Sequence, residues 1–327
     1  MMKLSTMWTV DQTYDTNGRS EIAEAIANRW THDRDSVRSF RSSANFINVL
    51  TRDGRPAFLR FAADTERSLD GIRQELDVLA RFHCEGLPVV QVVPSRSGSR
   101  IETVETSAAT FHAVLFDGLE GRHLDIDDLD IRLYREWGGT VGRLHAVFAQ
   151  TPPFQLRAAP SWEVALDTVE ADGSAFPDVI VREVERLRGL LRSLPRDAAR
   201  YGLIHRDLEM DNLVWDGKRF AILDFDEFSQ GWFMFDIAKA LSEPLDAGLS
   251  LASPELDTFL TGYREHKSIT DEDLSLLSDF RSLSTLLSYI AVDRALDIGA
   301  EEAPVTWLRD LIRQLEGWKQ RYEDSIV

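Results

Sequence analysis

Residues 203–238 read LIHRDLEMDNLVWDGKRFAILDFDEFSQGWFMFDIA, and this stretch decides the fold. It contains two short apolar runs, 213–215 and 220–223, on either side of the turn signal Asp216-Gly217. Apolar runs that flank a glycine-containing turn predict an antiparallel hairpin.

The predicted hairpin brings polar side chains together at its open end. If Trp215 pairs with Phe220, Asn212 lies opposite the residues near Asp224, and cross-strand Cα atoms are roughly 4.5–5.5 Å apart. Amide and carboxylate oxygens are ligands that Mg²⁺ accepts, together with phosphate oxygens and water. Asp207 lies in the loop before the hairpin, at the same end, where its carboxylate can face an acceptor hydroxyl.

These residue types match the needs of phosphoryl transfer, which are positioning, charge neutralisation and one carboxylate to deprotonate the acceptor. We assign that carboxylate to Asp207 and the metal to Asn212 and Asp224. Asp226 either assists as an outer metal ligand or faces the substrate. His205 is expected to brace the loop by hydrogen bonds to the backbone. Any single Asp here would more often be a turn or cap residue, but the order and spacing of the set favour the functional interpretation.

The HRDLxxxN run, the hairpin and the Asp-Phe-Asp end resemble the aminoglycoside phosphotransferase and choline kinase-like group. The resemblance is specific over the quoted stretch and topological elsewhere. It implies an α+β, protein-kinase-like bilobal fold with an antiparallel-sheet N-lobe and a mainly helical C-lobe. It also implies ATP as the donor, Mg²⁺ on Asn212 and Asp224, and Asp207 as the catalytic base. Asp236 would be the structural N-cap of the next helix.

The first third of the chain follows the element order of a kinase N-lobe. Periodicity and turn signals predict a helix over 20–30, a hairpin of 46–50 and 56–61, a helix over 69–82, and strands over 86–94, 100–104 and 111–116. We therefore place an N-lobe with a helical extension at residues 1–118 and the C-lobe at 119–327. The backbone at Leu115 to Asp117 then forms the hinge that meets the adenine of ATP.

The strand that carries a phosphate-pairing lysine in this group has Arg60 instead. The chain has no lysine between Lys3 and Lys218. A guanidinium can hold phosphate oxygens bidentately, so Arg60 is the predicted substitute, and the resemblance implies Glu75 as its partner on the following helix. The alternative for Arg60 is a charge at a strand edge in solvent.

A glycine-rich phosphate loop is also missing, because residues 40–46 read FRSSANF. Backbone N–H groups or the hydroxyls of Ser42 and Ser43 are the predicted phosphate contacts there. An ordinary polar turn is the alternative, since a loop without glycine adopts positive φ at greater cost.

The C-lobe is predicted to be helical, with helices over 133–148, 181–194 and after residue 246. The glycines at 138, 139 and 142 are interpreted as a close helix contact, because no phosphate-loop lysine follows them. His145 is interpreted as a packed structural histidine.

The length of the segment between Asp224 and Asp236 indicates which class of acceptor the enzyme uses. Eleven residues separate Asp224 from Asp236, too few for a long activation segment with a peptide-docking platform. This favours a small hydroxyl-bearing acceptor. Two alternatives remain: a stress-response-type protein Ser/Thr kinase, and a non-catalytic nucleotide-binding protein, which the absent lysine and glycines would suit.

Composition limits the partners. The 327 residues hold 37 Lys+Arg against 55 Asp+Glu, a net charge of −18. This disfavours nucleic acid and anionic membranes and is compatible with a cationic acceptor. One cysteine, Cys84, allows no internal disulfide, so we expect a reducing cytoplasm. Residues 1–15 lack a signal core, no apolar run approaches the ~18 residues of a membrane helix, and no pattern specifies an oligomeric state.

Overall fold

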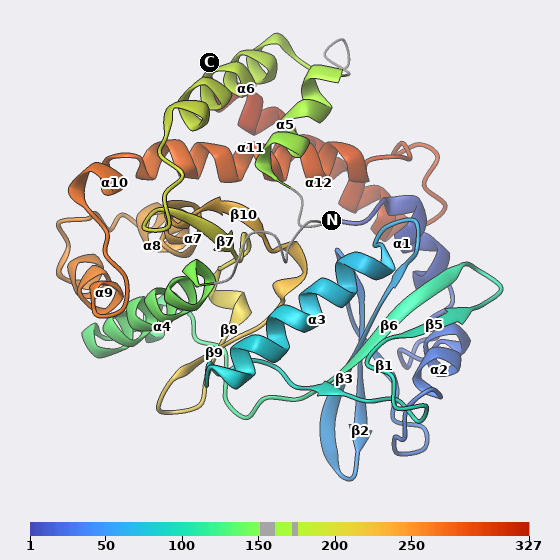
Figure 1. Ribbon diagram of the computed structural model, residues 1–327. Helices are drawn as coiled ribbons and strands as arrows, with labels where there is room; N and C mark the ends of the chain where they lie inside the picture. Colours follow the sequence, from blue (N-terminus) through green and yellow to red (C-terminus); the bar gives the residue numbers. More distant parts are fainter. Residues whose placement is uncertain (151–160, 172–175, 327) are drawn as a thin grey trace.

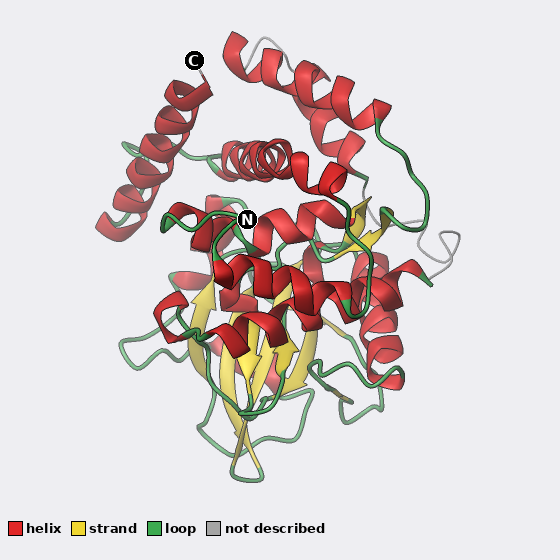
Figure 2. Ribbon diagram, turned by 90° about the vertical axis from the view of Figure 1, so that its left-hand side faces the viewer, coloured by secondary structure: helices red, strands yellow, loops and turns green. Residues whose placement is uncertain are grey.

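The computed structural model of this chain describes residues 1–150, 161–171 and 176–326, which form an antiparallel sheet followed by a helical region (Figure 1). The predicted α+β architecture is confirmed. Figure 2 shows the sheet at one end of the molecule and most of the helices stacked beyond it. Within the described residues, no helix combines the length and apolar character needed to cross a bilayer.

The N-lobe contains α1 (Leu4–Asp11), α2 (Glu21–Ala27), β1 (Arg38–Ser42), β2 (Phe46–Arg52), β3 (Arg55–Ala63), α3 (Leu69–Cys84), β4 (Val92–Val93), β5 (Glu102–Glu105) and β6 (Thr110–Asp117). The sheet order is β1-β2-β3-β6-β4, with β5 also paired to β6. Every pairing in this sheet is antiparallel.

The predicted hairpin of β2 and β3 is confirmed and closes on a two-residue turn. Arg52 pairs with Arg55, and the turn residues Asp53 and Gly54 have φ angles of 52° and 76°. Two successive positive φ angles characterise the tight turn whose twist matches that of paired strands, and an Asp-Gly pair suits it. This turn sets the register that brings Arg60 to the middle of the sheet, opposite Val114 of β6.

The predicted strand over 86–94 is wrong for most of its length, because only Val92 and Val93 belong to a strand. Gly86 ends α3 instead, with a φ of 76° and with Leu87 N donating to Phe82 O at 3.0 Å. Such a left-handed residue satisfies the last carbonyls of a helix and redirects the chain. The segment then crosses to the C-lobe, where Val89 forms a bridge with Ile222.

The C-lobe comprises η1 (Ile126–Asp128), α4 (Ile131–Ala149), α5 (Trp162–Ala171), α6 (Asp178–Ser193), β7 (Tyr201–Ile204), η3 (Met210–Asn212), β8 (Leu213–Trp215), β9 (Phe220–Ile222), η4 (Phe225–Glu227), β10 (Ser229–Trp232), α7 (Phe233–Ala240), α8 (Ser242–Asp246), α9 (Pro254–Arg264), α10 (Asp271–Ser275), α11 (Leu277–Ala295) and α12 (Thr306–Ile326). The helices predicted over 133–148 and 181–194 correspond to α4 and α6.

Two apolar cores cover the two faces of the N-lobe sheet. The N-lobe core contains α1 and α2 side chains packed on the sheet, and the central core joins α3 to the C-lobe helices. Helix α12 contributes to both, because Leu308 and Ile312 are buried in the N-lobe core and Tyr322 in the central core. The proposed lobe boundary at residue 118 therefore describes the sheet, while α12 returns to the N-lobe.

The glycines of α4 allow a close contact with α9, as predicted. A Cβ on Gly138 would lie 1.9 Å from the carbonyl oxygen of Phe259, and one on Gly142 would lie 2.6 Å from that of Tyr263. These atoms belong to the backbone of α9, so a side chain fits only if the helices separate. The contact places Tyr263 against His145, which lies one turn beyond Gly142.

We expect Gly138→Ala to lower the free energy of unfolding by at least about 1–3 kcal/mol, the usual cost of overpacking. Gly189→Ala is the matched control, because nothing lies within 4 Å of a Cβ at that position of α6. There the helix propensity of alanine should stabilise the protein by about 0.5–1 kcal/mol. Urea unfolding midpoints measure both, and equal shifts for the two variants would contradict the packing argument.

Candidate active site

The loop between β7 and η3 is held in place by Asp236. This carboxylate is fully buried and accepts the backbone N–H groups of His205 at 2.7 Å and Arg206 at 2.8 Å. Arg206 has a φ of 71°, so the hydrogen bonds stabilise a conformation that a non-glycine residue rarely adopts. The predicted N-cap role is wrong, because α7 begins at Phe233 and Asp236 lies within its first turn.

Asp236 is itself supported by a buried chain of hydrogen bonds. His145 Nε2 lies 3.0 Å from the carboxylate, and the Tyr263 hydroxyl lies 2.9 Å from His145 Nδ1. Burial lowers the pKa of His145 in spite of the contact with Asp236, so the imidazole is neutral. A neutral ring that donates from Nε2 accepts at Nδ1, which matches the tyrosine O–H. The predicted structural role of His145 is confirmed.

His205 braces the same loop from the other side, as predicted. Its Nε2 lies 2.8 Å from the carbonyl oxygen of Leu223, and the Asp207 N–H donates to its Nδ1 at 3.3 Å. The imidazole therefore joins the loop that carries Asp207 to the strand end that carries Asp224.

The hairpin has the predicted register, with Trp215 opposite Phe220 and Leu213 opposite Ile222. Leu223 N donates to the carbonyl oxygen of Asn212 at 2.9 Å, so Asp224 follows one residue beyond that contact. The side-chain NH₂ of Asn212 donates to Asp207 Oδ2 at 3.0 Å and to the Asp207 carbonyl oxygen at 2.7 Å.

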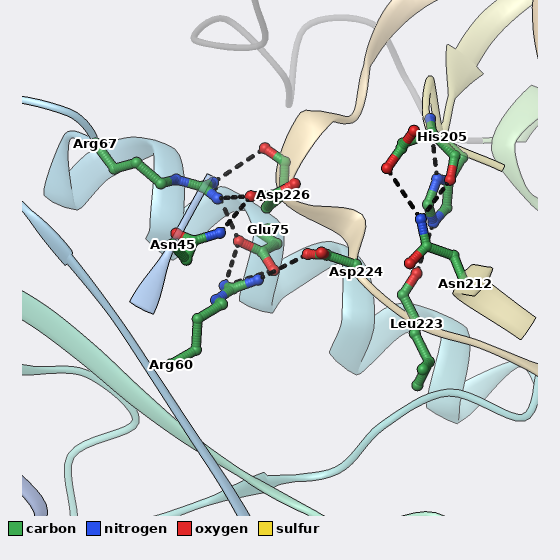
Figure 3. A network of polar contacts seen from close by, with 10 residues as sticks. Asn45, Arg60, Arg67, Glu75, His205, Asn212, Leu223, Asp224 and Asp226 are labelled. Carbon is green, nitrogen blue, oxygen red and sulfur yellow. Dashed lines mark hydrogen bonds and ion pairs between the residues drawn. The ribbon is translucent and has the colours of Figure 1, made fainter. Parts of the chain in front are cut away.

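Arg60 lies at the centre of the polar network in Figure 3. Its Nη2 is 2.7 Å from both carboxylate oxygens of Glu75, and its Nη1 donates to Asp224 Oδ1 at 3.3 Å. The predicted pairing with Glu75 is confirmed, and an exposed strand-edge charge is excluded because Arg60 is 7% exposed. Burial alone would lower the pKa of Arg60, but Glu75, Asp224 and Asp226 raise it overall, so the guanidinium stays charged.

Asp226 accepts hydrogen bonds from two side chains of the N-lobe (Figure 3). Its Oδ2 accepts Arg67 Nη1 and Asn45 Nδ2, both at 2.6 Å, and its carbonyl oxygen accepts Arg67 Nη2 at 3.0 Å. Burial would raise the pKa of Asp226, but Arg67, Arg60 and Asn45 lower it overall. Asp226 therefore joins η4 to the β1–β2 turn, a contact that the sequence did not predict.

The remaining residues fit a hard divalent cation. Because Asn212 uses its NH₂ on Asp207, its amide oxygen is oriented away from that contact and can serve as a ligand. Burial and the neighbouring Asp226 raise the pKa of Asp224 to about 8, although Arg60 opposes the shift. A bound cation would favour its ionised form. Within the described residues no group of three or more acidic, His or Cys side chains is arranged to hold a metal ion by itself. One carboxylate and one amide would therefore share the metal with phosphate and water.

The other predicted nucleotide residues are not brought to this network. Ser42 Oγ donates to Asp11 at 2.8 Å, and Ser43 N donates to the carbonyl oxygen of Asn45 at 3.1 Å. Leu115 is fully buried in the N-lobe core, because alternate residues of β6 face opposite sides of the sheet. Asp117 N donates to the carbonyl oxygen of Gln91 at 2.9 Å, and its carboxylate accepts Arg52.

A cavity of about 410 Å³ opens beside Asp207. Its walls combine charged, small polar and apolar side chains from the β7–η3 loop, η4, α7 and α11. They include Asp207, Asp226, Glu227, Arg206, Lys239, Ser284 and Ser288. The volume suits a small molecule in contact with the predicted base. Lys239 and the two serines lie on distant helices, and only a helical pattern over 233–240 and 277–295 could have pointed to them.

Comparison with known proteins agrees with this geometry. The model of the family described as APH, phosphotransferase enzyme family, matches residues 36–272. Amicoumacin kinase of Bacillus subtilis (strain 168) is 26% identical over 298 residues, which cover 86% of this chain and 87% of that protein. An uncharacterised protein of Deinococcus radiodurans is 24% identical over 92% of this chain and 90% of its own length.

Solved structures share the fold. The amicoumacin kinase hAmiN in complex with AMP-PNP, Ca²⁺ and Ami has a TM-score of 0.76 at 21% identity, over 96% of this chain and 95% of that one. The microcompartment-associated aminopropanol kinase has a TM-score of 0.70 at 23% identity, over 93% and 98%. The predicted kinase-like phosphotransferase fold is confirmed.

Proposed function

Because this chain belongs to the phosphotransferase enzyme family, we propose that it moves the γ-phosphoryl group of ATP to the hydroxyl of a small acceptor that also carries an amine. The observation that best supports this proposal is the cavity of about 410 Å³ that opens on Asp207. Its size favours a small acceptor over a protein segment. The joint placement of Asp207, Asn212 and Asp224 favours an active enzyme over a non-catalytic binder.

The residues divide the reaction among them. The acceptor oxygen attacks the γ-phosphorus while its proton passes to the Asp207 carboxylate. The bond from phosphorus to the β–γ bridging oxygen breaks, and ADP leaves with those electrons. Arg60, fixed by Glu75, neutralises phosphate oxygens. Asn212 and Asp224 would hold Mg²⁺, which supplies further charge neutralisation when it is bound.

Three observations support an amine on the acceptor. The cavity wall carries the carboxylates of Asp226 and Glu227 near the base, alongside the basic side chains of Arg206 and Lys239. The whole chain has a net charge of −18. A structural relative is named for aminopropanol, a compound with one amine and one hydroxyl. ATP as donor and the single Cys84 support a cytoplasmic activity.

The test is Mg²⁺-dependent release of ADP from ATP, with amicoumacin, 1-amino-2-propanol, spectinomycin, choline, homoserine and a generic protein as acceptors. We expect stimulation by at least one small amine-bearing alcohol. N-acetylation of the accepted compound, which removes the positive charge, should lower kcat/KM about tenfold or more, because a hydrogen bond to a charged group is worth about 1.5–3 kcal/mol.

The outcomes separate the parts of the proposal. Equal turnover of the acetylated and parent compounds would contradict the proposal that the acceptor carries a charged amine. Stimulation of ADP release by the protein alone would contradict the proposal of a small-molecule acceptor. For choline, whose nitrogen carries no proton, the matched control is the neutral analogue 3,3-dimethyl-1-butanol.

A further inference from the structure

Lys239 lines the acceptor cavity, and the reaction described so far gives it no role. It is on α7, and its side chain is 15% exposed. Its Nζ lies 2.5 Å from Glu209 Oε1 and 3.5 Å from Asp207 Oδ1, and the side chain lines the cavity of about 410 Å³. A largely buried lysine ammonium next to Asp207 calls for an explanation, because long charged side chains are usually found in solvent.

The same helix fixes both the base and the lysine. Asp236, in the first turn of α7, holds the backbone of the β7–η3 loop, and Lys239 follows three residues later. The Asp207 carboxylate is thereby contacted at both oxygens, by the Asn212 NH₂ at Oδ2 and by the lysine at Oδ1. At 3.5 Å the lysine contact is long for a hydrogen bond, so Oδ1 keeps capacity to accept an acceptor hydroxyl.

Glu209 anchors the ammonium and keeps it charged. Burial alone would lower the pKa of Lys239, but Glu209 and Asp207 raise it overall. Glu209 lies two residues after the base, and without the lysine its carboxylate would add to the negative charge around Asp207. The ion pair with Glu209 has no net charge, and of its two members it is Lys239 that lines the cavity.

We propose that Lys239 is a catalytic residue whose ammonium contacts an oxygen of the γ-phosphoryl group as this group passes to the acceptor, with Glu209 as its positioning residue. The inference rests on the proposed function, with Asp207 as the base. An acceptor oxygen that donates to Asp207 lies about 2.5–3.0 Å from Oδ1. The phosphorus that it attacks is one bond further, so the equatorial oxygens pass within reach of Nζ. Charge on these oxygens is what a phosphoryl-transfer site must stabilise.

The test compares Lys239→Met, which removes the charge at similar volume, with Lys239→Arg and with Lys218→Met, an exposed lysine in the β8–β9 turn. We expect Lys239→Met to lower kcat about 10²–10³-fold, the usual effect of removing one transition-state donor. KM for ATP and for the acceptor should change much less. Lys239→Arg should recover part of the loss, and Lys218→Met should match the parent enzyme.

A second measurement needs no acceptor. Aluminium fluoride bound with MgADP mimics the planar phosphoryl group, so it should tighten MgADP binding in the parent protein and much less in Lys239→Met. A purely structural lysine would lower the melting temperature but leave this increment unchanged, which would overturn the inference. An increase in acceptor KM with kcat unchanged would overturn it as well, and would assign Lys239 to acceptor binding. Failure of the proposed function differs from both, because the parent enzyme itself would then show no turnover.

Discussion

Asp207→Asn should lower kcat for phosphoryl transfer by about 10²–10⁴-fold, the range that a general base contributes. The substitution keeps the size of the side chain and an oxygen that can accept from Asn212, but an amide takes up no proton. MgATP binding should therefore remain close to that of the parent enzyme. The measurement is acceptor-stimulated ADP release, with nucleotide affinity determined in parallel by calorimetry.

Asp211→Asn is the matched control, since it removes a carboxylate at an exposed position of η3, four residues after Asp207. It should retain activity within about twofold, as expected of a surface carboxylate outside the site. Undiminished kcat in Asp207→Asn would rule out this residue as the base and would move the search to Asp226 or Glu227, which line the same cavity.

Asp236→Ala should produce the largest loss of stability, on the order of 3–5 kcal/mol. The substitution leaves the N–H groups of His205 and Arg206 and the Nε2–H of His145 without their acceptor in the interior. The loop that carries Asp207 would also relax from its strained conformation at Arg206. We therefore expect a lower urea midpoint and a loss of activity even well below that midpoint.

Asp246→Ala tests whether this effect is specific to burial. Asp246 pairs with Arg281, but its side chain is 70% exposed, so the unfolding midpoint should hardly change. If the two alanine variants unfold at the same urea concentration, the buried hydrogen bonds of Asp236 contribute far less than their geometry indicates.

The part of the site that is local in sequence could be predicted. The turn at Asp216-Gly217 and its two apolar runs determine the register of the hairpin, and the register places Asn212 beside the strand end that carries Asp224. The pairing of Arg60 with Glu75 came from the resemblance. It holds because the β2–β3 turn sets the register of the strand, while α3 packs against that face of the sheet.

The contacts between distant segments could not be predicted. Asp226 is bound by Asn45 and Arg67, which precede it by 181 and 159 residues, and nothing in the spacing of either encodes the contact. Lys239 comes within 3.5 Å of Asp207 because Asp236, in the first turn of α7, binds the backbone of the loop that carries Asp207. The N-cap assignment of Asp236 failed for a related reason: apolar residues from Phe233 start the helix earlier than the carboxylate suggests.

The path of α12 has a consequence for the synthesis of the chain. Leu308 and Ile312 are fully buried in the N-lobe core with Phe46, Phe61 and Phe111. Those aromatic residues are synthesised about 200–270 residues before Ile312, which corresponds to roughly 10–50 s at translation rates of about 5–20 residues per second. During that interval the nascent N-lobe has a complete sheet but an open apolar edge. The N-lobe of this enzyme is thus synthesised first and completed last, and until α12 arrives its apolar core remains open to chaperones and to aggregation.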